Sequence, residues 1–321
     1  MIDWVFVLTP VLVLPLALMF RFVGCGTILT IEPDPPSYRD YIMGEPYAGP
    51  VRNPGIKPDK ADIIGYWRLV DADSSPLAKD EKGFGNGLYK TVGYIDARAS
   101  TPTSPGSEGA AGDFQFVHDG LIVAEQTAEC RFFRGGHVVV NYEPGLYTDE
   151  FTIEAWFEEG WGEFTSNGAQ HTLFDAGGHY TGPAQSSPTY QGFSVFADAN
   201  KRWQVRLGAN LAEVFPSPPL VPLGARTHLA VTVEKDASGG TGGRRVTLYI
   251  DGKVAGTETV PLYTRPEGAP LVIGVTNAKA DPALPLQPDQ PVLGRVQEVI
   301  LYRKPLSQEE IENHVGINRV A

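Results

Sequence analysis

The sequence is poor in the residues that mark several common classes of protein. Its 321 residues include only two cysteines, Cys25 and Cys130. The disulfide framework of a small secreted domain is therefore absent, and no structural disulfide is expected. Basic residues number 26 against 38 acidic ones, and no Lys/Arg block occurs. Without clustered cations to neutralise a phosphate backbone, the chain is not expected to bind nucleic acid.

Chemical motifs are scarce as well. The sequence contains no P-loop, no nucleophile elbow and no paired-cysteine motif. It is rich instead in 36 glycines and 27 prolines, about a fifth of the chain against a usual total of roughly 12%. This composition disfavours a mostly helical protein, and 42% hydrophobic residues suffice for a sizeable core.

The longest apolar run lies at the N-terminus. Residues 4–20 (WVFVLTPVLVLPLALMF) carry no charge, and the apolar character resumes after Arg21. A helix that spans a bilayer needs about 20 mainly apolar residues, which this run supplies even though Pro10 and Pro15 would bend it. We therefore expect residues 1–31 to form one transmembrane anchor helix.

Two further expectations concern this anchor. Helices associate in lipid through small residues and polar contacts, so Ala17, Arg21, Gly24 and Gly26 are the expected contacts with other membrane subunits. No basic residue precedes the run, which argues against a cleaved signal peptide. A lipoprotein remains an alternative, because the sequence FVGC that ends at Cys25 resembles a bacterial lipoprotein box.

Residues 32–62 are rich in proline. Proline removes backbone donors and favours extended geometry, so we expect a semi-rigid, extended linker here and no helix. Four large side chains are unusual in a spacer, and they allow two interpretations: packing onto the chain's own domain, or contact with a neighbouring protein. These residues are Tyr38, Tyr41, Met43 and Tyr47.

From residue 63 onwards, apolar and polar residues alternate as in strands with one face on a core. The clearest cases are residues 151–157 (FTIEAWF), 228–234 (HLAVTVE) and 245–251 (RVTLYID), and Asp251-Gly252 predicts a tight hairpin into residues 253–257. Many short strands with Gly/Pro turns predict a sandwich or jelly roll. Further strands are expected at residues 66–70, 137–141, 172–175, 193–197, 203–208, 271–275 and 296–302.

One helix is expected near the C-terminus. Ser307 and Glu310 form a capping box, in which each side chain satisfies a free amide of the first turn. Leu306 and Ile311 add a hydrophobic staple.

Taken in order, several stretches resemble one family of all-β domains, the concanavalin A-like jelly roll of the laminin G and pentraxin-like superfamily. Each motif mainly encodes strands and turns, but together they cover about residues 63–316. The resemblance implies an all-β, two-sheet sandwich at residues 63–321, used for binding and sometimes appended to enzymes. The stretches are 65–69 (GYWRL), 85–89 (GNGLY), 151–157, 227–232 (THLAVT), 248–253 (LYIDGK) and 294–299 (GRVQEV).

Catalysis is not expected. Glucanases on this fold carry Glu-x-Asp-x-x-Glu along one strand, because glycoside cleavage needs two nearby carboxylates. Here Glu154 is alone in its strand, and Glu158, Glu159 and Glu163 follow in a Gly/Trp-rich stretch. Nor is zinc expected at His171, Asp175 and His179. Positions four apart on a strand are about 13 Å from one another, so the three could converge only if Gly177-Gly178 folds His179 back.

The resemblance implies two kinds of ligand. Many relatives bind calcium on a loop, and Asp80 and Asn86 supply oxygen donors beside glycines. The alternative is an Asx-type turn without an ion. A carbohydrate would be contacted by aromatic and histidine side chains on loops between strands, unless these only pack within the domain. These residues are Trp161, His179, Tyr180 and Tyr190.

Two signals conflict on which side of the membrane the domain lies. Arg21 and Arg39 follow the apolar run and nothing basic precedes it, which alone would place the domain in the cytoplasm. Members of the resembled family are mostly exported, so we expect an extracytoplasmic domain, on the periplasmic side in a bacterium.

These observations together predict a non-catalytic, membrane-anchored interaction module. The expected role is that of a structural or accessory subunit of a larger respiratory, photosynthetic or transport complex, with integral membrane proteins as partners and no required cofactor. The alternative is a lectin-like surface protein or lipoprotein that binds carbohydrate.

Overall fold

The computed structural model describes most of the domain and a short segment before it. The described residues are 38–44, 59–72, 75–90, 113–117, 121, 130–134, 136–160, 170–180, 189–208, 213–222, 224–236, 238, 242–266, 268–277 and 288–318. All structural statements below refer to these residues.

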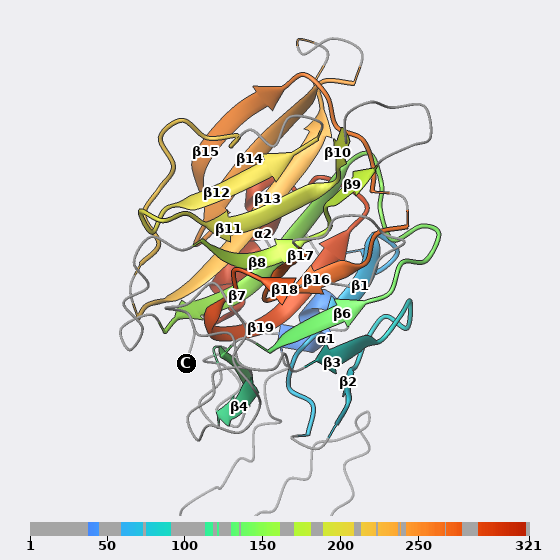
Figure 1. The fold of residues 1–321 in the computed structure, drawn as a ribbon, viewed down its shortest axis with the longest axis vertical. Helices are drawn as coiled ribbons and strands as arrows, with labels where there is room; N and C mark the ends of the chain where they lie inside the picture. The colour runs from blue at the N-terminus through green and yellow to red at the C-terminus, as the bar shows by residue number, and fades with distance from the viewer. Residues whose placement is uncertain are drawn as a thin grey trace, which may run out of the picture.

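Two antiparallel sheets form the body of the domain (Figure 1). Sheet A contains β1 (Ile63–Trp67), β4 (Asp113–Val117), β5 (Cys130–Arg134), β7 (Phe151–Glu159), β13 (Arg226–Lys235), β14 (Arg244–Ile250), β15 (Lys253–Val260) and β19 (Leu293–Tyr302). Their spatial order is β15–β14–β13–β7–β19–β5–β4, with β1 paired to the C-terminal half of β19.

Sheet B is seven-stranded and faces sheet A. It contains β2 (Leu77–Ala78), β3 (Gly87–Lys90), β6 (His137–Val140), β8 (His171–Asp175), β11 (Phe193–Ala197), β12 (Trp203–Leu207) and β16 (Leu271–Ile273), in the order β12–β11–β8–β16–β6–β3–β2. Two small ribbons complete the strands: β9 (Gly178–Tyr180) with β10 (Thr189–Gln191), and β17 (Thr276–Asn277) with β18 (Pro288–Asp289). The expected all-β sandwich is thereby confirmed.

The main core lies between the two sheets. The odd positions of β7 point into it, where Phe151 and Phe157 pack against residues of sheet B such as Phe193 and Trp203. The hairpin predicted at Asp251-Gly252 is present, since it joins β14 to β15.

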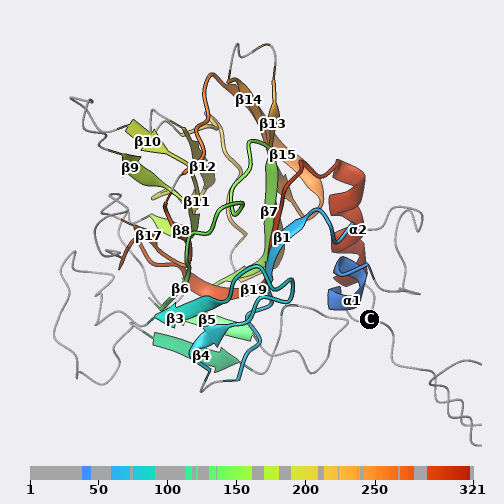
Figure 2. The same cartoon turned by 90° about the vertical axis from the view of Figure 1, so that its right-hand side faces the viewer.

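The opposite face of sheet A is buried too, which the alternating pattern did not predict. Helices α1 (Tyr38–Ile42) and α2 (Gln308–Asn318) lie beside sheet A on the side away from sheet B (Figure 2). They cover a second apolar layer that includes Trp156 of β7 and Tyr302 of β19. The central strands of sheet A are therefore enclosed on both faces.

Helix α2 begins as its sequence predicts. The backbone N–H of Ser307 donates to Glu310 Oε2 at 2.7 Å, and the N–H of Glu310 donates to Ser307 Oγ at 3.2 Å, which is a capping box. Leu306 and Ile311 are both buried in the second apolar layer. The predicted cap and the burial of its two staple residues are confirmed.

Helix α1 differs from the extended linker expected at residues 32–62. Tyr38, Tyr41 and Ile42 are buried in the second apolar layer, and Met43 packs against it. The ring of Tyr41 meets the ring of His314 edge-on at 6.0 Å. For these residues the structure decides for packing onto the chain's own domain, whereas Tyr47 lies outside the described residues. Burial of three large side chains outweighs the weak helix propensity of so short a segment.

The expected membrane helix is not among the described elements. Within the part of the chain that the structure describes, no helix is both long and apolar enough to cross a bilayer. Residues 1–37, which hold Ala17, Arg21, Gly24 and Gly26, lie outside that part.

If α1 belongs to the domain, truncating its most buried aliphatic residue should destabilise the whole fold. Ile42 is fully buried, so Ile42→Ala is expected to lower the free energy of unfolding by about 2–5 kcal/mol. Val254→Ala is the control, because Val254 is 49% exposed and should change stability by about 0.5 kcal/mol or less. Urea denaturation measures both, and an Ile42→Ala protein as stable as the control would show that α1 does not dock.

Candidate functional site

Asp80 and Asn86, the calcium candidates, lie close together in the turn between β2 and β3. Asp80 Oδ1 accepts hydrogen bonds from the N–H groups of Tyr66 and Lys82, and its Oδ2 accepts one from Gly85. Asn86 Oδ1 accepts the N–H of Asp80 at 2.9 Å. These oxygens face amide donors, the geometry of an Asx-type turn that closes without an ion. The calcium assignment stays a prediction, and the described residues contain no group of three or more metal-ligating side chains.

The carbohydrate candidates are partly brought together. His179 and Tyr180 lie on β9, and Tyr190 lies on β10, where its backbone pairs with that of His179. Trp161 lies outside the described residues. Three of the four candidate residues therefore belong to the same two-stranded ribbon, β9–β10.

His171 and Asp175 sit at opposite ends of β8 and have separate partners. The Nδ1 of His171 donates to the carbonyl of Pro291 at 2.7 Å, and burial lowers the pKa of this imidazole. Asp175 accepts the hydroxyl of Thr276 at 2.6 Å and the N–H of Gly177 at 2.8 Å. The His171 side chain thus bonds to the segment before β19, and the Asp175 side chain bonds to β17 and to the residue pair after β8.

Glu154, the one carboxylate in the middle of β7, is fully buried beneath α2. It accepts hydrogen bonds from the hydroxyl of Tyr302 at 2.9 Å and from Nδ1 of His314 at 2.9 Å. His228 Nε2 lies 3.4 Å from the other oxygen, without hydrogen-bond geometry. Burial is the largest single effect and by itself would raise the pKa of Glu154, but the interactions with His314 and His228 together outweigh it and hold this pKa well below its usual range. Glu154 is a structural ion-pair member shut off from solvent.

The acidic residues that follow Glu154 are also engaged. Glu158 pairs with the guanidinium groups of Arg295 and Arg226. Glu159 is buried and accepts the N–H of Gly224 at 3.2 Å. Glu163 lies outside the described residues. None of the described carboxylates of β7 and its end is thus open to a substrate in the way that glycoside cleavage requires.

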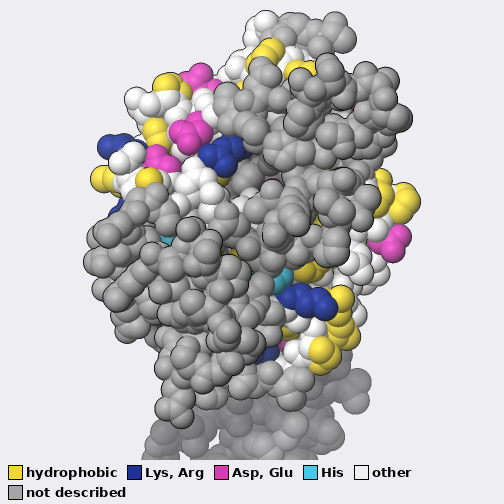
Figure 3. All heavy atoms as spheres, viewed as in Figure 1, with side chains coloured by type: hydrophobic (Ala, Val, Ile, Leu, Met, Phe, Trp, Pro, Cys, Tyr) yellow, Lys and Arg dark blue, Asp and Glu magenta, His cyan; other side chains and the backbone are white. Residues whose placement is uncertain are grey.

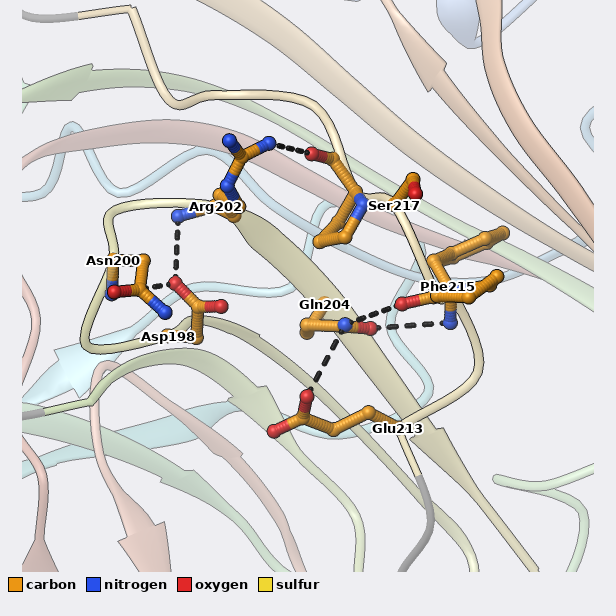
Figure 4. Close-up of a pocket in the computed structure, with 9 residues that line it drawn as sticks. Asp198, Asn200, Arg202, Gln204, Glu213, Phe215 and Ser217 are labelled. Carbon is orange, nitrogen blue, oxygen red and sulfur yellow. Dashed lines mark hydrogen bonds between the residues drawn. The ribbon is translucent and has the colours of Figure 1, made fainter.

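A polar cavity lies at edge strand β12, between the β11–β12 turn and the segment that follows this strand (Figure 4). Its volume is about 580 Å³, within the range of about 300–1,000 Å³ that is usual for ligand sites. In the space-filling view, described side chains of both charges lie at the upper left of this face, around the β11–β12 turn (Figure 3). The lining residues are Asp198, Asn200, Arg202, Gln204, Glu213, Phe215, Pro216, Ser217 and Pro218.

One wall of the cavity is the β11–β12 turn. Asp198 Oδ1 accepts the N–H groups of Asn200 at 2.8 Å and Arg202 at 2.9 Å, which closes the turn. Lys201 adopts a φ of 58°, the left-handed conformation typical of a three-residue hairpin loop. The turn therefore fixes the backbone from which the side chains of Asn200 and Arg202 project at the rim.

The other wall is formed by residues 215–219 (FPSPP), which we call the proline arch. The chain is pinned to β12 on both sides of the arch, by the bond from Val214 N–H to the carbonyl of Val205 at 2.8 Å and by the bond from Trp203 N–H to the carbonyl of Pro219 at 2.9 Å. Arg202 spans the cavity and donates to the carbonyl of Pro218 at 2.8 Å. Prolines restrict the backbone between these anchors, so the wall is pre-organised.

Gln204 forms the floor. On β12 the side chains of Trp203, Val205 and Leu207 point into the core, so that of Gln204 points outward. Its amide donates to the carbonyl of Phe215 at 2.6 Å and accepts the N–H of Phe215 at 3.2 Å, and it also reaches Glu213 at 3.3 Å. The side-chain amide of Gln204 thus pairs with the backbone of Phe215 as a peptide group would, and this pairing holds the proline arch to β12.

Sequence reasoning missed this site. The signals were an Asx turn, Asp198-Ala199-Asn200, between two predicted strands, and the run FPSPP about 15 residues later. Neither stretch carries an aromatic residue of the kind sought at sugar sites, since Phe215 buries its ring in the sandwich core. Only the pairing of residues 213–221 along β12 brings the two stretches together.

The two antiparallel sheets define the class of the protein, a two-sheet jelly roll. The family model of the concanavalin A-like lectin/glucanases superfamily matches residues 134–312, more than half of the chain. The protein therefore belongs to this superfamily, as the resemblance in its motifs indicated. A search of curated proteins gave no match.

Several solved structures are similar to this chain at low sequence identity. Domain 4 of AbnA, an extracellular arabinanase of Geobacillus stearothermophilus determined with arabinotriose, is 16% identical at a TM-score of 0.45, with 79% of this chain and 98% of that one covered. Trypanosoma rangeli sialidase with sialic acid is 16% identical at a TM-score of 0.49, with 87% of this chain and 36% of that one covered. This chain thus spans about a third of the sialidase, and the likeness concerns the fold alone.

Stability should depend on pH through Glu154. Because its pKa is lower in the folded state than the value of about 4.3 in an unfolded chain, its contribution is complete above about pH 5 and is lost as the pH falls below about 4. Glu154→Gln should cost about 3–5 kcal/mol at pH 7, since it removes the buried carboxylate to which Tyr302 and His314 donate. Urea denaturation at pH 7 and pH 3 should show this difference shrinking at low pH.

The control is Glu143→Gln, because Glu143 is exposed. The control should lie close to the parent at both values of pH. A Glu154→Gln protein that loses the same stability at pH 7 and at pH 3 would show that folding does not lower the pKa of this carboxylate.

Proposed function

We propose that the protein is a non-catalytic module that binds carbohydrate in the cavity beside β12. The observation that carries this proposal is a polar cavity of about 580 Å³ whose walls are fixed before any ligand arrives. A sugar presents many hydroxyl groups, and the lining offers both donors and acceptors to them. Fixed walls reduce the entropy that a ligand must overcome on binding.

The lining separates residues that build the cavity from residues that can contact a ligand. Asp198 and Gln204 are engaged with backbone groups and hold the walls. Asn200 and Ser217 are exposed on the rim, one on each wall, and supply an amide and a hydroxyl. The exposed ring of Pro216 offers an apolar surface for the C–H face of a sugar.

The charge of the cavity favours a neutral sugar. Its formal charges are those of Asp198, Arg202 and Glu213, a balance of one negative charge. Arg202 donates to the neutral carbonyl of Pro218 and keeps its charge, so an acidic sugar would meet two carboxylates and one cation, a net negative surrounding. A neutral hydroxyl-rich ligand avoids that repulsion.

The same carboxylates do not form a hydrolytic pair. Asp198 holds two backbone amides, and Glu213 is exposed and lies 3.7 Å from the guanidinium of Arg206. A glycosidase instead places its acid in an apolar surrounding, with the second carboxylate at a set distance across the sugar. We propose binding without turnover; release of reducing sugar that ceases in Glu213→Gln would contradict it.

Binding is tested with the full-length protein on an array of neutral and acidic glycans. We expect neutral glycans to bind, and the double variant Asn200→Ala/Ser217→Ala to weaken the affinity about 5- to 100-fold, since two hydrogen bonds are worth roughly 1–3 kcal/mol. Asn141→Ala is the control, because Asn141 is exposed and remote in sequence from the cavity residues. An array without binding, or equal affinity in the double variant, would contradict the proposal.

We further propose, from the sequence, that residues 1–31 anchor the chain in a membrane with the domain on the extracytoplasmic side. The support is the apolar run of residues 4–31, interrupted only by Arg21. A membrane-complex subunit would use Ala17, Arg21, Gly24 and Gly26 as contacts, whereas a lectin needs the anchor only for attachment. A mature protein that begins at a lipidated Cys25 would replace the helix by a lipid anchor.

A further inference from the structure

Docking of helix α1 limits how far the domain can lie from the chain segment that precedes this helix. The helix is held to the domain in two ways. Tyr38, Tyr41 and Ile42 are at most 2% exposed beneath α2 and along sheet A. Arg39 Nε donates to Glu81 Oε2 at 2.8 Å, which ties α1 to the turn between β2 and β3.

This docking shortens the tether between the apolar run and the folded domain. From Ile31 to Tyr38 there are seven residue steps, which reach at most about 25 Å when fully extended. From Ile31 to Ile63, the first residue of β1, the reach would be about 115 Å. The position of α1 therefore decides whether the domain stays close to the anchor or moves freely over a large volume.

The docking also gives the domain a direction. Helices α1 and α2 lie on the side of sheet A that faces away from sheet B (Figure 2). The cavity lies on the outward side of sheet B, above Gln204. The short tether therefore joins the domain on one side, and the cavity opens on the opposite side.

We propose that the face formed by α1 and α2 is the membrane-proximal face of the domain, and that docked α1 holds the cavity pointing away from the bilayer. This inference rests on the proposed membrane anchor. The occupant of the space beneath this face is the lipid surface, and the covalent tether brings it there. Attraction to anionic lipid is not involved, because α2 carries Glu309, Glu310 and Glu312 and no basic residue in its last turn.

The test uses the full-length protein in phosphatidylcholine vesicles that contain an acceptor-labelled lipid. A fluorescent donor amino acid is introduced at Gln308, exposed at the start of α2, or at Ser217, exposed on the proline arch. We expect strong energy transfer to the lipid from position 308 and weak transfer from position 217. Equal transfer from the two positions would overturn the proposal.

Two variants carry the same flexible 20-residue insertion, one before α1 and one after it. They show which part of the linker sets the distance between the domain and the bilayer. An insertion after Asp34 lies between the apolar run and α1, and should lower the transfer from position 308. An insertion after Pro54 lies between α1 and β1, and should leave that transfer unchanged because α1 remains docked. If the second insertion lowers transfer as much as the first, α1 does not set the distance and the proposal is wrong.

The failures of the two proposals can be told apart. A protein that does not co-sediment with the vesicles lacks the membrane anchor, which overturns both. A protein that co-sediments but shows equal transfer from positions 308 and 217 retains the anchor and overturns only the orientation. Glycan binding by the same preparation reports separately on the cavity.

Discussion

The burial of both faces of sheet A is the constraint on which the arrangement of this protein depends. A strand buried on one side can carry polar residues on the other, but Thr152, Glu154 and Trp156 of β7 lie beneath α1 and α2. A buried carboxylate is stable only with donors and a counter-charge. Tyr302 from β19 and His314 from α2 both donate to Glu154, so this buried group links α2 to the sheet.

A second buried carboxylate, on the neighbouring strand β19, repeats this arrangement. Glu298 of β19 is fully buried, pairs with Arg68 at 3.0 Å and accepts the hydroxyl of Tyr66. It sits at an irregularity in the β19–β7 pairing with a φ of 57°, and its N–H donates to the carbonyl of Arg68. The bulge lets β19 pair with β5 along its first half and with β1 along its second. The polar groups of this layer thus join segments from both ends of the domain.

The two sheets consequently serve different purposes. Sheet A is covered by helices and holds the segment that leads to the N-terminal apolar run, whereas the edge of sheet B at β12 carries the polar cavity. The cavity depends on sheet A only through the core, where the Phe215 ring anchors the proline arch. A ligand site on a pinned turn and a pinned arch can vary in its rim residues without disturbing the buried ion pairs.

The sequence by itself determined the sandwich, because apolar alternation in residues 151–157, 228–234 and 245–251 and the turn at Asp251-Gly252 are local signals. It also determined the start of α2, since the bonds of Ser307 with Glu310 span three residues. The tertiary structure decided what pairs across long separations. Docking of α1 onto α2, burial of Glu154 beneath His314, and the meeting of Asp198 with the proline arch each depend on strand order. Strand order has no local signature, because the same alternating pattern suits a central or an edge strand, and a polar residue in it suits water or a buried partner equally well.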